Sequence, residues 1–362
     1  MLILGLPEII VEFRKRAETM KSRSQRGIVA LAFKDLVAKS MSYTFNSYDE
    51  VDQKGFSEKS LGYIKMAFRG NPYKVIVEII DDTLEGEIKV RGLDSVLKDL
   101  ENKPFNYLSI PTIKDEEDKQ QVADWISKVR QKGKMRKAVL PLMDNPDNKA
   151  VINFKTTGIK EKEIDIDASE YTSRLAGVFA GLPLTQSSTY YKLEELTSIV
   201  TIDNPDEVID NGGLILINDG NKIKIARGVN SMVTVGENDI ESFKKIKVLE
   251  ISDMIHEDIW QTWEEYYSGK VSNTYINKVL FLNTINDYFK NLMNDGILDN
   301  DVEAYLQIDI EEQKKFLKNN NIDYTEMSEQ QIKEANTGSY LFAEGQIRIA
   351  DAMEDLKIKL YV

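Results

Sequence analysis

The sequence predicts an α/β fold, α+β overall, on three observations. Gly27–Phe33 ("GIVALAF") is a continuous apolar run, which is typical of a strand buried on both faces. From Phe105 to about residue 240, short apolar runs alternate with longer amphipathic stretches, as in a mainly parallel sheet covered by helices. The chain has 362 residues, 42% of them apolar, which is enough for about two to three domains with their own cores.

The first 92 residues are predicted to form an arm and a small β-rich domain. We expect residues 1–26 to be an N-terminal arm and linker, in which Glu8–Phe13 has strand character and the next residues are too basic to be buried. Residues 27–92 are the expected β-rich domain, with an internal strand at 27–33. Strand-like segments then follow between residues 42 and 91, including "LGYIKMAF" and "YKVIVEII".

Residues 93–240 are predicted to form the α/β domain. We expect strands at 105–111, 137–143 and 149–154, helices at 93–102, 114–132, 168–183 and 204–213, and a hairpin of 214–218 with 222–228. In the helix at 168–183, the small residues Ala176, Gly177, Ala180 and Gly181 permit close packing against a neighbouring element.

Residues 241–362 are predicted to form a C-terminal domain. We expect a strand at 244–251, a helix from Ser252 or Asp253 to Tyr267, a helix at 279–298 ended by Gly296, and a strand at 302–309. Helices near 311–321 and 328–336 and two terminal strands, 346–349 and 356–362, follow.

The last strand poses a question about partners. Its apolar residues Leu356, Ile358, Leu360 and Val362 alternate with Lys357, Lys359 and Tyr361, which is typical of a strand with one buried face. Nothing follows in this sequence that could cover its free edge. Because an uncovered edge strand invites pairing with another chain, we expect this segment to pair between chains.

Composition argues against most catalytic chemistry. The chain has no cysteine and a single histidine, His256, which excludes disulfides, thiolate chemistry and multi-histidine metal sites. The sequence lacks a phosphate-binding glycine loop and a G-x-S-x-G elbow, and "DNDVEAYLQIDI" has Ala304 and Ile310 where a calcium loop needs Gly and Glu. We expect His256 to be catalytically idle, and we expect no cofactor and no metal. A carboxylate pair for hydrolysis stays open, because acids are abundant and no spacing singles out a pair.

Charge and hydropathy limit the partners. The net charge of −13 disfavours nucleic acid and anionic lipid as partners, and no apolar run approaches the length of a membrane span. "MLILGLPEII" lacks a basic flank and a cleavage site, so a signal peptide is not expected. Glu12–Arg26 holds six basic and two acidic residues (net +4), and Asp299–Ala335 holds ten acidic and four basic residues (net −6). These two segments could attract each other between copies, or could be solvated faces without a role.

Several stretches, in order, resemble the contractile phage tail sheath proteins, in the short form found in phages, prophages and phage-tail-like bacteriocins of Gram-positive bacteria. They are "GLPEIIVEFRKRAETMKSRSQRGIVALAFKD", "SRLAGVFAGLPLTQSSTYYKLEEL" with its S-x-T stretch, "NPDEVIDNGGLILINDGNKIKIARGVNSM" with its R-G-x-N-S end, "DMIHEDIWQTWEEYYSGKVSNTYINK" and "DAMEDLKIKLYV". The resemblance implies a subtilisin-like α/β middle domain without a catalytic triad. It also implies a C-terminal domain whose sheet is completed by strands from neighbouring subunits.

The resemblance further implies a function. A structural subunit that is not an enzyme would polymerise as a helical cylinder around an inner tail tube, assemble in the host bacterial cytoplasm, and contract to drive the tube through the cell envelope of the target. Its partners would be other sheath subunits, the tube protein, and baseplate and tail terminator proteins, with no nucleic acid and no membrane.

The resemblance also implies roles for particular residues. Strand exchange between subunits would use Ile9, Ile10, Val11, Phe13, Leu356, Ile358, Leu360 and Val362. Linker hinges would lie at Arg14, Arg16, Arg23 and Gly345, and Lys278 and Lys290 are candidate contacts to the tube. Two alternatives stay open: a soluble α/β hydrolase that uses carboxylates, and a monomeric binding module whose termini fold back onto its own sheet.

Overall fold

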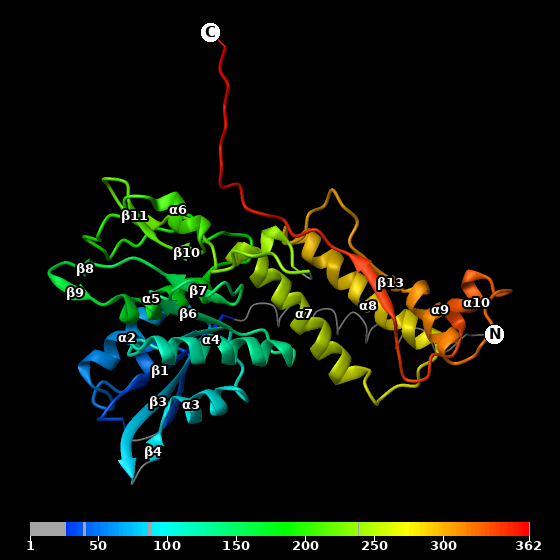
Figure 1. Cartoon of the computed structure of the whole chain (residues 1–362), viewed down its shortest axis with the longest axis horizontal. Coiled ribbons are helices and arrows are strands. Elements are labelled where there is room, and N and C mark those ends of the chain that lie inside the picture. The colour runs from blue at the N-terminus through cyan, green and yellow to red at the C-terminus, as the bar shows by residue number, and fades with distance from the viewer. Residues whose placement is uncertain (1–26, 39–40, 86–87, 238, 362) are drawn as a thin grey trace, which may run out of the picture. The chain divides into compact units, whose positions relative to one another are not determined.

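The computed structural model describes residues 27–38, 41–85, 88–237 and 239–361 (Figure 1). Of these, residues 27–253 and 351–361 form one compact unit, here called the sheet unit, and residues 254–350 form a second, the helical unit.

The sheet unit is built on an eight-stranded, mostly parallel sheet. Its strands lie in the order β10-β7-β6-β5-β1-β3-β2, with β4 paired to β3. All neighbours from β10 to β3 are parallel, whereas β2 and β4 run antiparallel to β3. The bounds are β1 Ile28–Lys34, β2 Ser42–Phe45, β3 Lys74–Glu85, β4 Ile88–Arg91, β5 Tyr107–Ser109, β6 Lys137–Pro141, β7 Val151–Phe154 and β10 Gly213–Leu214. The mainly parallel sheet expected from the sequence is confirmed.

Residues 27–92 share this sheet with the rest of the unit. The predicted internal strand at 27–33 is confirmed as β1, in which Val29 pairs with Val75 of β3 on one side and with Tyr107 of β5 on the other. A strand paired on both edges cannot belong to a separate sheet. The strands that we expected to form a small domain of their own therefore continue the α/β sheet.

Helices cover both faces of the sheet, as Figure 1 shows. One apolar core joins alternate residues of β1 and β3 to α2 (Glu58–Phe68) and α5 (Ala168–Gly181). The other core joins the opposite face to α3 (Leu93–Leu100) and α4 (Glu116–Gln131). Smaller elements of this unit are η1 Tyr48–Glu50, the hairpins β8–β9 (Ile159–Glu161, Ile164–Ile166) and β11–β12 (Leu216–Asn218, Ile223–Ile225), α6 Pro205–Asp210 and η2 Glu241–Lys244.

Two segments read as strands in the sequence are helices. "LGYIKMAF" lies in α2, where Ser57 caps the N-terminus and Ser60, Ile64 and Ala67 are buried at helical spacing. "KKIKVLEI" opens α7 (Ile246–Tyr266), so neither Ser252 nor Asp253 is an N-cap. In both cases the apolar run is short enough to fit the period of a strand or of a helix. Packing against the neighbouring elements favours the helix.

The small residues of α5 do permit close packing. A Cβ on Gly177 would lie 2.0 Å from the carbonyl oxygen of Ala67 in α2, and one on Gly181 would lie 1.8 Å from that of Gly70. The two backbones are therefore close enough that no larger side chain fits between them.

The helical unit holds the rest of α7, then α8 (Tyr275–Asn294), α9 (Ile310–Asn319), α10 (Glu329–Glu334) and the two-stranded antiparallel sheet β13–β14 (Tyr305–Ile308, Ala343–Gln346). Its core includes Phe281, Ile285, Tyr288 and Leu292 of α8. Gly296 adopts a φ of +70°, close to the end of α8 where the sequence places it.

Candidate assembly surfaces

The apolar side chains of the predicted terminal strand are exposed. Residues 351–361 have no regular secondary structure. Leu356, Ile358 and Leu360 are 85%, 63% and 86% exposed. Apolar side chains at period two, with no partner strand in the described chain, present an edge and a face that another strand could cover.

The β13–β14 ribbon presents another edge. All four residues of β14 are exposed. Gly345 lies within β14 opposite Leu306, and a Cβ there would fall 2.0 Å from the carbonyl oxygen of Tyr305. Glycine is thus required for close strand approach, and movement at Gly345 would have to break paired backbone. Its role as a hinge stays a prediction.

The two candidate tube lysines differ in their surroundings. Lys278 is 3% exposed, and its ammonium donates to the Thr337 hydroxyl at 2.7 Å. Burial lowers the pKa of Lys278. Lys290 is exposed and lies 3.1 Å from Asp287 in an i,i+3 pair on α8. Of the two, Lys290 is therefore the side chain placed to meet another protein, and a tube contact stays a prediction.

The predicted arm lies outside the described residues. The strand-exchange residues Ile9, Ile10, Val11 and Phe13 and the hinge residues Arg14, Arg16 and Arg23 belong to it. Val362, at the other end of the chain, also lies outside the described residues.

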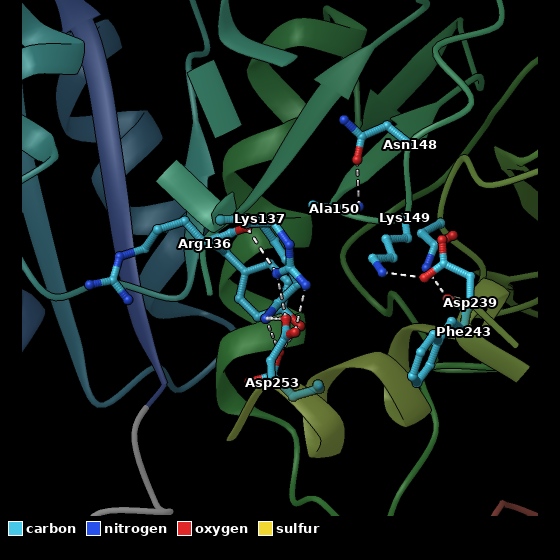
Figure 2. A network of polar contacts seen from close by, with 12 residues as sticks. Arg136, Lys137, Asn148, Lys149, Ala150, Asp239, Phe243 and Asp253 are labelled. Carbon is cyan, nitrogen blue, oxygen red and sulfur yellow. Dashed lines mark hydrogen bonds and ion pairs between the residues drawn. The ribbon is translucent and has the colours of Figure 1, made fainter. Parts of the chain in front are cut away.

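One buried ion network of the sheet unit lies where β5 and β6 begin (Figure 2). Asp253 accepts two hydrogen bonds from Arg130, at 2.7 and 2.8 Å, and one from Lys137 at 2.9 Å. Glu250 lies 2.8 Å from Lys137 and accepts a bond of 2.6 Å from the Tyr107 hydroxyl. Two cations face two anions, so the network is balanced.

Burial and the paired charges together set the direction of the pKa shifts in this network. Burial alone would raise the pKa of Asp253, but Lys137 and Arg130 outweigh it and hold that pKa below its usual value. Burial, together with Glu250, raises the pKa of Tyr107 well above its usual value. Asp253 is therefore held ionised and Tyr107 protonated, and the network joins α7 to the sheet.

No other arrangement among the described residues suggests catalysis. His256 is exposed on α7. In the described part of the chain, no cluster of three or more His, Cys, Asp or Glu residues could hold a metal ion. Across the same residues, no helix has the length and apolar character needed to cross a membrane.

The chain matches known proteins along almost its whole length. Residues 86–231 match the family model of the phage tail sheath protein central domain, and residues 238–362 match that of the phage tail sheath C-terminal domain. A tail sheath protein of Clostridium phage phiCD119 is 36% identical over 367 residues, covering 98% of this chain and 99% of the relative. The chain belongs to the phage tail sheath family.

Solved structures agree with the fold. A sheath tail protein from Listeria innocua superimposes with a TM-score of 0.69 at 14% identity, covering 95% of this chain and 100% of the other. One from Desulfitobacterium hafniense gives 0.65 at 15% identity, covering 78% and 90%. The helical sheath of the anti-feeding prophage in its contracted state gives 0.65 at 11% identity, covering 92% of each chain.

Membership of this family settles the class of function. The chain is a structural subunit of a contractile tail sheath, a component of a phage tail or phage-tail-like particle, and not an enzyme. The resemblance seen in the sequence is confirmed, and the hydrolase alternative is set aside.

Sequence reasoning missed one group of functional candidates. Asp351, Glu354 and Asp355 bind the sheet unit directly before the exposed segment. The S-x-T and R-G-x-N-S motifs that provide most of their partners were visible in the sequence. A pairing across more than 120 residues was not visible.

Proposed function

We propose that this sheath subunit polymerises into a helical cylinder around an inner tail tube and contracts to drive the tube through a target envelope. Baseplate and tail terminator proteins would bound the cylinder at its ends. Subunits would be joined by strand donation. Leu356–Val362 of one copy, and the arm around Ile9–Phe13, would add to a sheet of a neighbouring copy.

The observation that carries this proposal is the exposed alternation of Leu356, Ile358 and Leu360. Burying one such side chain contributes about 1.5–3 kcal/mol, and the backbone hydrogen bonds of a strand set its register. The ribbon β13–β14 is the acceptor we favour, because all four residues of β14 are exposed and the ribbon belongs to the C-terminal domain. A head-to-tail contact of this kind propagates into rings or helices rather than closing a dimer.

The domain roles are part of the same proposal. The finer topology of the α/β domain, about 93–240, is subtilisin-like without a triad, which its parallel sheet with helices on both faces supports. Residues 241–362 form the sheath domain that exchanges strands, residues 27–92 extend the sheet at its other edge, and residues 1–26 form the arm and linker.

The test compares the two faces of the terminal segment. One variant carries Leu356→Ser, Ile358→Ser and Leu360→Ser. Its matched control carries Lys357→Ser, Lys359→Ser and Tyr361→Ser. We expect the parent and the control to form regular hollow cylinders in negative-stain electron microscopy, and the apolar variant to elute as folded single subunits. Cylinders from the apolar variant would refute the donated-strand proposal.

A further inference from the structure

The residues just before the exposed segment are bound tightly to the sheet unit. Lys245 lies 2.5 Å from Asp351 and 3.5 Å from Glu354, and Arg227 pairs with Asp355. Three acids within five residues thus meet two cations that come from elsewhere in the same unit. Directly after them, every residue from 356 to 361 is exposed.

Glu354 occupies a socket built for a carboxylate. The hydroxyls of Ser187 and Thr189 both donate to its Oε1 at 2.6 Å, and its side chain is 5% exposed. The backbone N–H of Gly228 donates to the Thr189 hydroxyl at 3.0 Å, which orients that hydroxyl toward the carboxylate. Charge-assisted hydrogen bonds of this kind are roughly twice as strong as neutral ones.

The socket explains two motifs that had no assigned role. Ser187–Thr189 is the S-x-T stretch, and Arg227–Gly228 opens the R-G-x-N-S segment. A Cβ on Gly228 would fall 2.4 Å from the Ser188 hydroxyl and 3.4 Å from that of Ser187. Any larger residue at 228 would therefore crowd the wall that receives Glu354.

We propose that this socket is an intrachain latch, in which Glu354 fixes residues 351–355 to the sheet unit and so sets the point from which residues 356–361 leave the subunit. This inference rests on the proposed strand donation for its purpose, but not for its geometry. Without Glu354 in its socket, Leu356 would be held by Ala350 and by the solvent-exposed ion pairs of Asp351 and Asp355, which contribute little. When those pairs open, the six Cα–Cα steps from Ala350 let Leu356 range over up to about 20 Å. With the latch, the donated strand starts from a fixed point, so less conformational entropy is lost when it adds to a neighbour.

Single-molecule energy transfer tests the latch on isolated subunits. The chain has no cysteine, so Asp206→Cys on α6 and Leu356→Cys place one donor and one acceptor dye, both at exposed positions. At picomolar dilution we expect one narrow peak in the donor–acceptor distance distribution, which is taken from the nanosecond donor decay because loop motion averages out within a single-molecule burst. Glu354→Ala should abolish that narrow peak and leave a broad, shifted distribution. Glu163→Ala, an exposed glutamate outside the socket, is the matched control and should leave the peak unchanged.

Two further variants separate the latch from general loss of folding. Ser187→Ala with Thr189→Ala removes the donors and leaves Glu354 in place, and it should broaden the distribution as Glu354→Ala does. Glu354→Gln keeps an acceptor oxygen but loses the attraction to Lys245, and it should give an intermediate width. Circular dichroism should be unchanged in all of them. A narrow peak retained in both Glu354→Ala and the double hydroxyl variant overturns the latch.

Assembly provides the second readout. In the parent chain, which carries neither dye cysteine, the Glu354→Ala variant should form fewer and less regular cylinders than the Glu163→Ala variant. If the peak broadens while the apolar-face variant of residues 356–360 still forms cylinders, the latch stands and strand donation fails. If the peak is unchanged, the latch is refuted, whether or not cylinders form.

Discussion

Replacing Asp253 by asparagine tests the ion network that joins α7 to the sheet. The carboxylate has a side-chain exposure of 6% and receives three hydrogen bonds, two from Arg130 and one from Lys137. The amide has the same size but no charge, so two buried cations would share the single remaining acid, Glu250. Breaking a buried ion pair by removing one partner costs about 3–5 kcal/mol. Because the free energy of unfolding of a domain is about 5–15 kcal/mol, Asp253→Asn should remove a large fraction of the stability of the sheet unit.

The assay is urea unfolding of the sheet unit. Trp125 of α4 stacks on Phe105 with ring centroids 6.3 Å apart, so its fluorescence reports this unit once Trp260 and Trp263 are replaced by Phe. The protein concentration is kept where the midpoint no longer depends on it, so that assembly does not contribute.

The matched control for this assay is Asp165→Asn. Asp165 is 77% exposed and lies 3.2 Å from Lys160, so its loss should change stability by less than about 1 kcal/mol. If Asp253→Asn costs no more than Asp165→Asn, the network does not hold α7 in the way argued.

The same network predicts a dependence on pH. The pKa of Asp253 is lower in the folded state than its usual value of 3.8. Its contribution is therefore complete above the unfolded pKa and is lost as the pH falls through the folded pKa. Below pH 3.8 the parent should lose stability more steeply than Asp253→Asn, as measured by the unfolding midpoint at each pH. Parallel curves would contradict this assignment.

Three other predictions concern packing and buried polar groups, each measured by urea unfolding. Gly177→Ala should destabilise the sheet unit by about 1–3 kcal/mol or more, because its Cβ would overlap the backbone of α2. Gly62→Ala, in α2 with no atom within 4 Å of the new Cβ, should stabilise the sheet unit by up to about 1 kcal/mol. Equal effects of the two would refute the close-approach argument. Tyr288→Phe should cost the helical unit about 1–3 kcal/mol, since the tyrosine hydroxyl donates to buried Asp258 at 2.8 Å. A loss under about 0.5 kcal/mol would show that this bond contributes little. The lowered pKa of Lys278 means that the unfolded state binds its proton more tightly, so stability should rise as the pH climbs toward 10.5, and Lys278→Met should flatten that rise.

Local patterns identified most of the elements correctly where the pattern was long or had a clear boundary. The helix at 114–132 appears as α4, with Val122, Ile126 and Val129 buried on one face. The hairpin across Asp219–Asn221 appears as β11–β12, because turn residues specify the register locally. The predicted strand at 244–251, where α7 begins, was wrong because this segment is short and has no clear boundary. A segment of eight residues fits a strand or a helix equally well, and the choice depends on what it packs against.

Pairings between distant residues could not be read from the pattern. The sequence predicts Ser252 or Asp253 as a helix cap, because an acid at a helix start is a common local signal. In the structure it is a buried partner of Arg130 and Lys137, more than 110 residues away. Likewise the sequence predicts that the strands of 27–92 form a domain of their own, whereas β1 pairs with β5 of the α/β domain.

The terminal segment shows which features follow from consecutive residues and which require the tertiary fold. Alternation in Leu356–Val362 is a property of consecutive residues, so the sequence alone predicts that one face of this segment is covered by a partner. Family motifs, recognisable because their residues are contiguous, determined the class of protein. Where that segment is held was decided only by the fold, which brings Ser187, Thr189, Arg227 and Lys245 around Asp351–Asp355. Side chains separated by 106 to 167 residues meet only after the sheet and its loops have formed, and no local pattern encodes that meeting.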